Sequence, residues 1–164
     1  MKLSITLAFV VLLTLAATAG AQTKIAGTVQ CAKADPQHMV PVGDRANHSL
    51  ALAKSNCTWT KPIEMAGLAA KDGVDTEFDD MTGNNSRGSG YFVGTMANGD
   101  KFYVRYQGTA TLKDGMPQTI EGTWSYTNGT GKLKGLKGKG TYKGKGNPDG
   151  GVTYEVEGDY QLPK

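Results

Sequence analysis

The sequence has few of the residues that metal and nucleophile chemistry require, with two histidines and two cysteines among 164 residues. His38 and His48 lie between Cys31 and Cys57, in the order C-x6-H-x9-H-x8-C. Zinc ligands normally come in pairs about two to four residues apart, so that one turn presents both, and these gaps do not fit. No G-x-S-x-G elbow occurs, and neither histidine lies in a recognisable triad segment. The sequence predicts no metal site, no cofactor and no catalytic residue.

Long hydrophobic runs are also missing, except for one near the start of the chain. Residues 1–21 contain Lys2, the apolar stretch LAFVVLLTLAA and then small residues, which are the three regions of a secretory signal peptide. The apolar stretch is shorter than the roughly 20 residues that a membrane-spanning helix needs. We expect cleavage after Ala21, no membrane span, and a secreted or periplasmic chain in which residues 22–164 form one domain.

The two cysteines both follow this leader. An even number of cysteines in an exported chain indicates a disulfide, because the compartments outside the cytosol are oxidising. The sequence therefore predicts a disulfide between Cys31 and Cys57.

A large excess of one charge is absent, since the formal net charge is only +3. A dedicated nucleic-acid binder is strongly basic, so we expect no specific nucleic-acid partner. The basic surplus lies in one segment, GTGKLKGLKGKGTYKGKG, residues 129–146. This segment is either a solvated turn-rich region or a surface for anionic polymers, whose candidate residues are Lys132, Lys134, Lys137, Lys139, Lys143 and Lys145.

The same segment lacks the order of a phosphate-binding loop. Residues 135–141, G-L-K-G-K-G-T, have glycine where the Walker lysine belongs, and no helical pattern follows. The dinucleotide pattern G-x-G-x-x-G fails as well, because the closing glycine comes one position late at both candidate places. We interpret these glycines as residues of turns and of closely packed strands.

Alternation of apolar and polar residues predicts an all-β fold. Asn98 and Gly99 are typical of a two-residue I′ hairpin turn. That turn sets a register in which three pairs share the apolar face: Thr95 with Phe102, Val93 with Val104, and Tyr91 with Tyr106. Two later segments alternate as clearly, with Ile120, Gly122, Trp124 and Tyr126 on one face of the first and Val152, Tyr154, Val156, Tyr160 and Leu162 on one face of the second.

Further strands are expected at residues 24–31 and 48–60, in VDTEFDD and after Gly138, for a total of about eight. Residues 31–47 are expected to be a loop. The segment PIEMAGLAAK, residues 62–71, fits either a short helix or a strand interrupted by Gly67. One-sided alternation with glycine-rich turns predicts a single antiparallel barrel, with a flattened sandwich as the alternative.

The segment SYTNGTGKLKGLKGKGTY, with EGTW before it, resembles the G-G-T-G-x-F-x-G-x-x-G segment of dirigent proteins and the allene oxide cyclase family. It is also similar to small secreted bacterial proteins of unassigned function with the same calycin-like barrel. Asn128 replaces the first glycine of the motif, and the residues that fit it are Gly129, Thr130, Gly131, Leu133 and Gly138. The resemblance implies an antiparallel eight-stranded barrel.

The resemblance also implies a place to look for acidic residues, since both families use carboxylates in a barrel pocket. No segment of this chain aligns with either family's acidic motif. The one dense carboxylate group is in DGVDTEFDDMTG, which lacks the EF-hand order for Ca²⁺. The group consists of Asp75, Glu77, Asp79 and Asp80, and alternation places the first three on one face, which we interpret as the solvated face of a strand.

Two classes of function remain for a small barrel protein of this kind. The first is binding of a small apolar molecule inside the barrel, where Gly108, Gly122 and Gly158 have the inward parity and leave space. The second is a surface interaction through the lysine segment, and an isomerase like the allene oxide cyclases is a third. The candidate interior residues are Tyr91, Phe102, Val104, Tyr106, Trp124, Tyr126, Tyr154 and Val156, with Tyr160 nearby.

Overall fold

The structure is a computed structural model that describes residues 22–163; the expected signal peptide, residues 1–21, lies outside the described residues. Within that range there is no α-helix, and no helix there is long and apolar enough to cross a membrane. The elements are β1 (Thr23–Cys31), β2 (Gln37–Pro41), β3 (His48–Lys61), β4 (Glu64–Met65), β5 (Leu68–Thr82), β6 (Asn85–Met96), β7 (Lys101–Lys113), β8 (Met116–Gly129), the 3-10 helix η1 (Gly131–Leu133), β9 (Lys137–Gly146) and β10 (Val152–Gln161).

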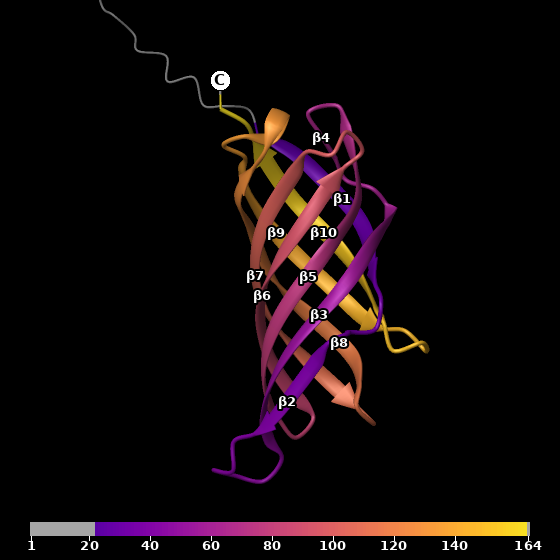
Figure 1. The fold of residues 1–164 in the computed structure, drawn as a ribbon, viewed down its shortest axis with the longest axis vertical. Helices are drawn as coiled ribbons and strands as arrows, with labels where there is room; N and C mark the ends of the chain where they lie inside the picture. Colours follow the sequence, from indigo (N-terminus) through magenta and orange to yellow (C-terminus); the bar gives the residue numbers. More distant parts are fainter. Residues whose placement is uncertain (1–21, 164) are drawn as a thin grey trace, which may run out of the picture.

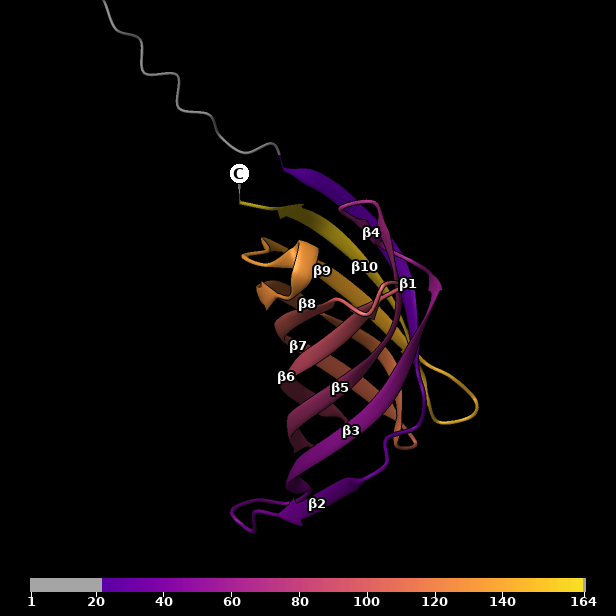
Figure 2. The same cartoon turned by 45° about the horizontal axis from the view of Figure 1, so that its top comes forward.

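Eight of the strands close an antiparallel barrel (Figures 1 and 2). Their order around the barrel is β3, β1, β10, β9, β8, β7, β6 and β5, and β5 pairs back with β3. Two short strands are additional, β2 on the free edge of β3 and β4 on β5. The predicted antiparallel barrel of about eight strands is confirmed, and the sandwich alternative is wrong.

Alternating side chains give this barrel its core. Along β7, Phe102 and Val104 are buried inside, whereas Lys101 and Arg105, which flank them, are exposed. The predicted disulfide is also present, between Cys31 on β1 and Cys57 on β3, which lie directly opposite each other in the ladder. It therefore joins two neighbouring barrel strands.

The two ends of the barrel differ. One end, where η1 and β4 lie at the top of Figure 1, is closed by apolar side chains that are almost completely buried, Met65, Met96, Leu133 and Leu136. Toward the opposite end, where β2 lies, the inward residues of β7 change from buried to half-buried at Tyr106, Gly108 and Ala110. The interior is therefore more accessible to solvent from the end nearest β2.

The hairpin between β6 and β7 has a different register from the predicted one. The C=O of Met96 accepts a hydrogen bond from Gly99 N–H (2.9 Å), and Met96 N–H donates to the C=O of Asp100 (2.8 Å). The loop therefore has three residues, and within it only Gly99 has a positive φ, at 89°. An odd loop shifts the pairing by one residue, so that Thr95 pairs with Lys101 rather than with Phe102.

This shift corrects the predicted position of Tyr91. Tyr91 pairs with Arg105 and lies on the outer face, with 57% of its surface exposed. Phe92 pairs with Val104 and occupies the interior in its place. The predicted pairs Val93 with Val104 and Tyr91 with Tyr106 are wrong for the same reason.

The structure corrects the expectation for one further segment and decides between two alternatives for another. The expected loop at residues 31–47 contains β2, whose residues are all exposed, so that no burial pattern in the sequence marked it. In the segment at residues 62–71 the helix alternative is wrong. Ala66 and Gly67 have φ values of 53° and 73°, typical of a tight hairpin turn, and join β4 to β5.

Candidate functional site

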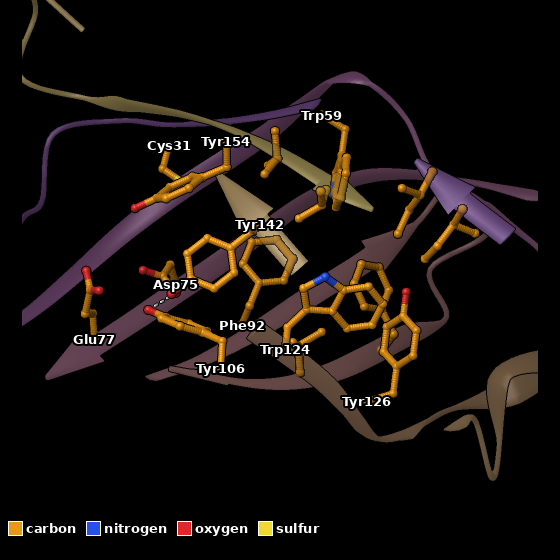
Figure 3. Close-up of a pocket in the computed structure, with 16 residues that line it drawn as sticks. Cys31, Trp59, Asp75, Glu77, Phe92, Tyr106, Trp124, Tyr126, Tyr142 and Tyr154 are labelled. Atoms are coloured by element: carbon orange, nitrogen blue, oxygen red, sulfur yellow. Dashed lines mark hydrogen bonds between the residues drawn. The ribbon is translucent and has the colours of Figure 1, made fainter. Parts of the chain in front are cut away.

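The barrel contains a cavity of about 90 Å³ whose wall is mostly aromatic (Figure 3). Half of its sixteen lining residues carry aromatic rings: Trp59, Phe92, Phe102, Tyr106, Trp124, Tyr126, Tyr142 and Tyr154. Several of the rings pack edge to face, including Trp59 with Phe92 at 6.4 Å and Tyr106 with Tyr142 at 5.8 Å between ring centroids. Such contacts are favourable because ring edges carry positive and ring faces negative charge. They hold the wall of the cavity in place.

Most of the predicted interior residues line this cavity. Phe102, Val104, Tyr106, Trp124, Tyr126, Tyr154 and Val156 do so, and Tyr91 does not. Tyr160 lies near the closed end, where its hydroxyl accepts a hydrogen bond from Ala66 N–H (3.1 Å).

The prediction missed three aromatic residues of the wall. Phe92 was missed because of the hairpin register, and Trp59 because the first half of the chain alternates less regularly. Tyr142 lies within the lysine-rich segment, where glycine and lysine alternate, and it has the parity of the glycines Gly140 and Gly144. That shared parity is the signal that indicates an inward position.

The inward glycines make room for aromatic rings and do not themselves form the cavity. A Cβ atom added at Gly122 would lie 2.5 Å from Cζ of Tyr142, and one added at Gly158 would lie 2.5 Å from Cζ2 of Trp124. Trp124 is further fixed by a hydrogen bond from its Nε1 to the C=O of Thr141 (3.1 Å). The expectation that the glycines leave empty space is therefore corrected, because rings fill that space and the cavity is what they enclose.

Three carboxylates of β5, those of Asp75, Glu77 and Asp79, have the inward parity, whereas Asp80 has the opposite parity and is exposed. Asp75 and Glu77 line the cavity, which corrects their interpretation as a solvated strand face. The pairing of Cys57 with Gly73 places the odd-numbered residues of this part of β5 inside. Phe78, with the opposite parity, has 44% of its surface exposed. The usual pattern is thus inverted, with acids inside and an aromatic residue outside, and such departures are expected at functional sites.

Two neighbouring hydroxyls bind these carboxylates. Tyr106 donates a hydrogen bond from its hydroxyl to Oδ1 of Asp75 (2.8 Å), as Figure 3 shows. Ser86 donates from Oγ to Oδ1 of Asp79 (2.5 Å), one step closer to the open end. No hydrogen bond to the Glu77 carboxyl group occurs within residues 22–163, so its oxygens are free to accept one.

Burial is the main reason why these acids hold protons more tightly than usual. It raises the pKa of Asp75 to about 6, although the hydrogen bond from Tyr106 acts in the opposite direction. Burial, reinforced by the charges of Asp79 and Asp75, raises the pKa of Glu77 to about 8. The pKa of Asp79 is raised by burial too. The burial of the Tyr106 hydroxyl, together with the nearby carboxylates, raises its pKa well above the usual range.

The lysines of the glycine-rich segment lie outside the cavity, on the surface of the protein. Lys137, Lys139, Lys143 and Lys145 point outward from β9, and Lys132 and Lys134 lie in and after η1, all of them exposed. Acidic residues of the neighbouring strands stand beside two of them, because Lys139 pairs with Asp159 and Lys143 pairs with both Glu155 and Glu121. The charge on this face is therefore mixed.

The glycine-rich turn before β9 uses its backbone N–H groups within the protein. Lys132 N–H donates to Oδ2 of Asp100 (3.0 Å), and the N–H groups of Gly129 and Gly135 donate to Oδ1 of Asn128 (2.8 and 3.1 Å). An added Cβ at Gly131 would collide with the Asp100 carboxylate. These glycines therefore hold a turn together, in a segment where a phosphate loop would leave its N–H groups free.

The solved structures that are similar to this barrel include the following two. A pterocarpan synthase dirigent protein matches with a TM-score of 0.51 and 12% identity, over 88% of this chain and 87% of that one. A protein of unknown function from the DUF3224 family of Shewanella oneidensis MR-1 matches with a TM-score of 0.48 and 14% identity, over 87% of this chain and all of that one. No protein-family model and no curated protein sequence matches the chain.

The fold and the first of these likenesses define a dirigent-like barrel, which confirms the resemblance seen in the glycine-rich segment. At 12% identity the likeness shows the fold alone. The chain is a small barrel protein whose activity is unassigned, and whose interior combines an aromatic wall with buried acids.

Proposed function

We propose that this protein binds a small, largely apolar molecule inside its barrel. The observation that carries the proposal is the cavity itself, in which eight aromatic rings surround a space and two carboxylates, Asp75 and Glu77, lie at its edge. Ligand sites in proteins are typically apolar cavities with a few polar groups that fix orientation. Glu77, which has no hydrogen-bond partner within the described residues, is such a group.

The size of the cavity limits the ligand. Its volume of about 90 Å³ is smaller than the roughly 150 Å³ of an apolar cavity that accepts benzene. The cavity therefore takes a slender molecule, or one end of a longer molecule whose remainder extends toward the open end beyond Tyr106. Broad ring systems require the aromatic wall to move.

The location that fits this function is outside the cytosol. The leader at residues 1–21 predicts export, and the disulfide between Cys31 and Cys57 supports it, because disulfides persist in oxidising compartments. An exported barrel of this kind would meet its ligand in the periplasm or outside the cell.

The alternative function, binding of anionic polymers through the lysine segment, has less support than binding inside the barrel. Exposed lysines gain little from isolated anions at physiological salt, where the Debye length is about 8 Å. Carboxylates stand directly beside Lys139 and Lys143, which reduces the attraction further. Binding inside the barrel is therefore the function that the geometry supports best.

The experiment is a ligand screen with a matched pair of variants. Fatty acids, isoprenoids and small phenolics are screened by thermal shift and by the emission of Trp59 and Trp124, which both line the cavity. A ligand at 100 times its Kd stabilises the fold by about 2.7 kcal/mol, which raises Tm by several degrees.

Two substitutions on one strand then locate the binding. Val104→Phe adds volume inside the cavity and should abolish binding, whereas Tyr103→Phe on the outer face of the same strand should leave it unchanged. Circular dichroism confirms that each variant is folded. Failure of every compound to shift either signal, or equal binding by both variants, contradicts the proposal.

A further inference from the structure

We propose that the molecule bound in the barrel carries a positively charged nitrogen, and that its class is the slender primary alkylammonium ions. The inference rests on the proposed function, since it names the ligand of the same cavity. Its ammonium group lies between Asp75 and Glu77, and its alkyl chain lies along the aromatic wall.

The carboxylates have no positive partner in the protein. Among residues 22–163, no lysine, arginine or histidine forms an ion pair with Asp75, Glu77 or Asp79. Their neighbours across the ladder are uncharged: Ser55, Ala53 and Ala51 on β3, and Phe92, Gly90 and Gly88 on β6. Buried carboxylates without a counter-charge are costly, so a cation bound beside them offsets that cost.

A glycine on β6 lets two of the acids pack closely against the backbone. A Cβ atom added at Gly88 would lie 2.8 Å from Oε1 of Glu77 and 2.9 Å from Oδ1 of Asp79. The carboxylates of Glu77 and Asp79 therefore occupy the space over this glycine and lie close to each other on the inner wall. An ammonium group that approaches them meets hydrogen-bond acceptors rather than side-chain carbon.

The aromatic wall favours the same charge. Tyr106, Tyr142 and Tyr154 follow one another around the cavity, with successive ring centroids 5.8 and 6.0 Å apart (Figure 3). The faces of such rings are negative and attract ammonium groups. The acids and the rings are independent features of the wall, yet both attract a cation and both repel an anion.

The rest of the wall selects an organic cation over a metal ion. Within the described range no group of three His, Cys, Asp or Glu side chains is arranged to hold a metal. Calcium takes six to eight oxygen ligands, and most of this wall consists of ring and aliphatic carbon. An alkylammonium ion needs oxygen only at its nitrogen, and its chain packs against carbon.

The test compares three ligands of equal length and different charge: pentylammonium, 1-pentanol and pentanoate. Titration calorimetry is run at about pH 8.5, where Glu77, whose pKa is about 8, is largely ionised and a primary ammonium group keeps its proton. We expect pentylammonium to bind at least about tenfold more tightly than 1-pentanol, and pentanoate to bind more weakly than either.

A substitution separates the charge from the cavity. Glu77→Gln should weaken pentylammonium binding about tenfold and leave 1-pentanol binding unchanged, whereas Glu121→Gln on the exposed face of β8 should change neither. Asp75→Asn serves as a second variant if Glu77→Gln does not fold.

The outcomes distinguish the two proposals. Binding of 1-pentanol as tight as that of pentylammonium, or an unchanged affinity for pentylammonium in Glu77→Gln, overturns the cationic ligand and leaves binding in the barrel intact. Absence of binding by all three probes, together with a screen in which no compound binds, overturns the proposed function itself.

Discussion

Burial of Asp75 makes the stability of the barrel fall as the pH rises, the reverse of the usual behaviour of an aspartate in an ion pair. Burial raises the pKa of Asp75 from 3.8 to about 6 in the folded chain. Between these values the folded chain keeps a proton that the unfolded chain has lost, so stability declines as pH rises through this window. The difference corresponds to roughly 3 kcal/mol, lost in full only above the folded pKa.

Asp75→Asn isolates this effect. Asparagine does not titrate, and its carbonyl oxygen can still accept the hydrogen bond from Tyr106. Urea unfolding, followed by tryptophan fluorescence, gives the free energy of unfolding of both proteins from about pH 3.5 to 8. Ionisable groups that do not interact with Asp75 are common to both chains and cancel in the difference, whereas the pKa of Glu77, which the charge of Asp75 raises, is lower in the variant.

We expect the stability of the wild-type chain, relative to the variant, to decrease by about 2 to 3 kcal/mol across this range. In the wild-type chain Glu77 adds a further decline near its own pKa of about 8, and in the variant this decline is smaller because the charge of Asp75 no longer raises that pKa. A difference that stays constant, or one that grows with pH, contradicts the burial of Asp75 in the barrel.

Three further changes test other parts of the account. Replacing both Cys31 and Cys57 with serine should destabilise the fold by about 3 kcal/mol and lower the urea midpoint; an unchanged midpoint would show that the disulfide does not constrain the chain. Gly122→Ala should lower the free energy of unfolding by about 1 to 3 kcal/mol, because its Cβ displaces Tyr142, and near-ultraviolet circular dichroism should report the moved ring. An unchanged stability would contradict that packing. Retention on an anionic resin through residues 132–145 should fall steadily with salt and with each lysine replaced, whereas salt-resistant binding lost by a single substitution would indicate a shaped anion site.

The sequence predicted the barrel because its later strands alternate cleanly. In β10, Val156 and Tyr154 share one parity and Glu155 and Glu157 the other, and the one-sided pattern is what closes a sheet around an apolar interior. The disulfide followed from an even cysteine count in a chain that was expected to be exported. These features are local, so one sequence is enough to find them.

The site was harder to predict because its positions depend on contacts between strands. The dipeptide Asn98-Gly99 fits a loop of two or of three residues, and that difference alone exchanges Tyr91 for Phe92 in the interior. In β5 the apolar parity of Val74 and Phe78 suggests the opposite face from the one that is buried. Only the pairing of β5 with β3 and β6 decides that the acids lie inside.

The central claim is that the interior of the barrel holds a ligand, and a crystal structure grown with pentylammonium tests it most directly. The account predicts ligand density in the cavity beside Trp124, with the nitrogen within hydrogen-bond distance of Asp75 or Glu77. Rings that close over an empty interior, both with pentylammonium and with the tightest-binding compound of the screen, would contradict it.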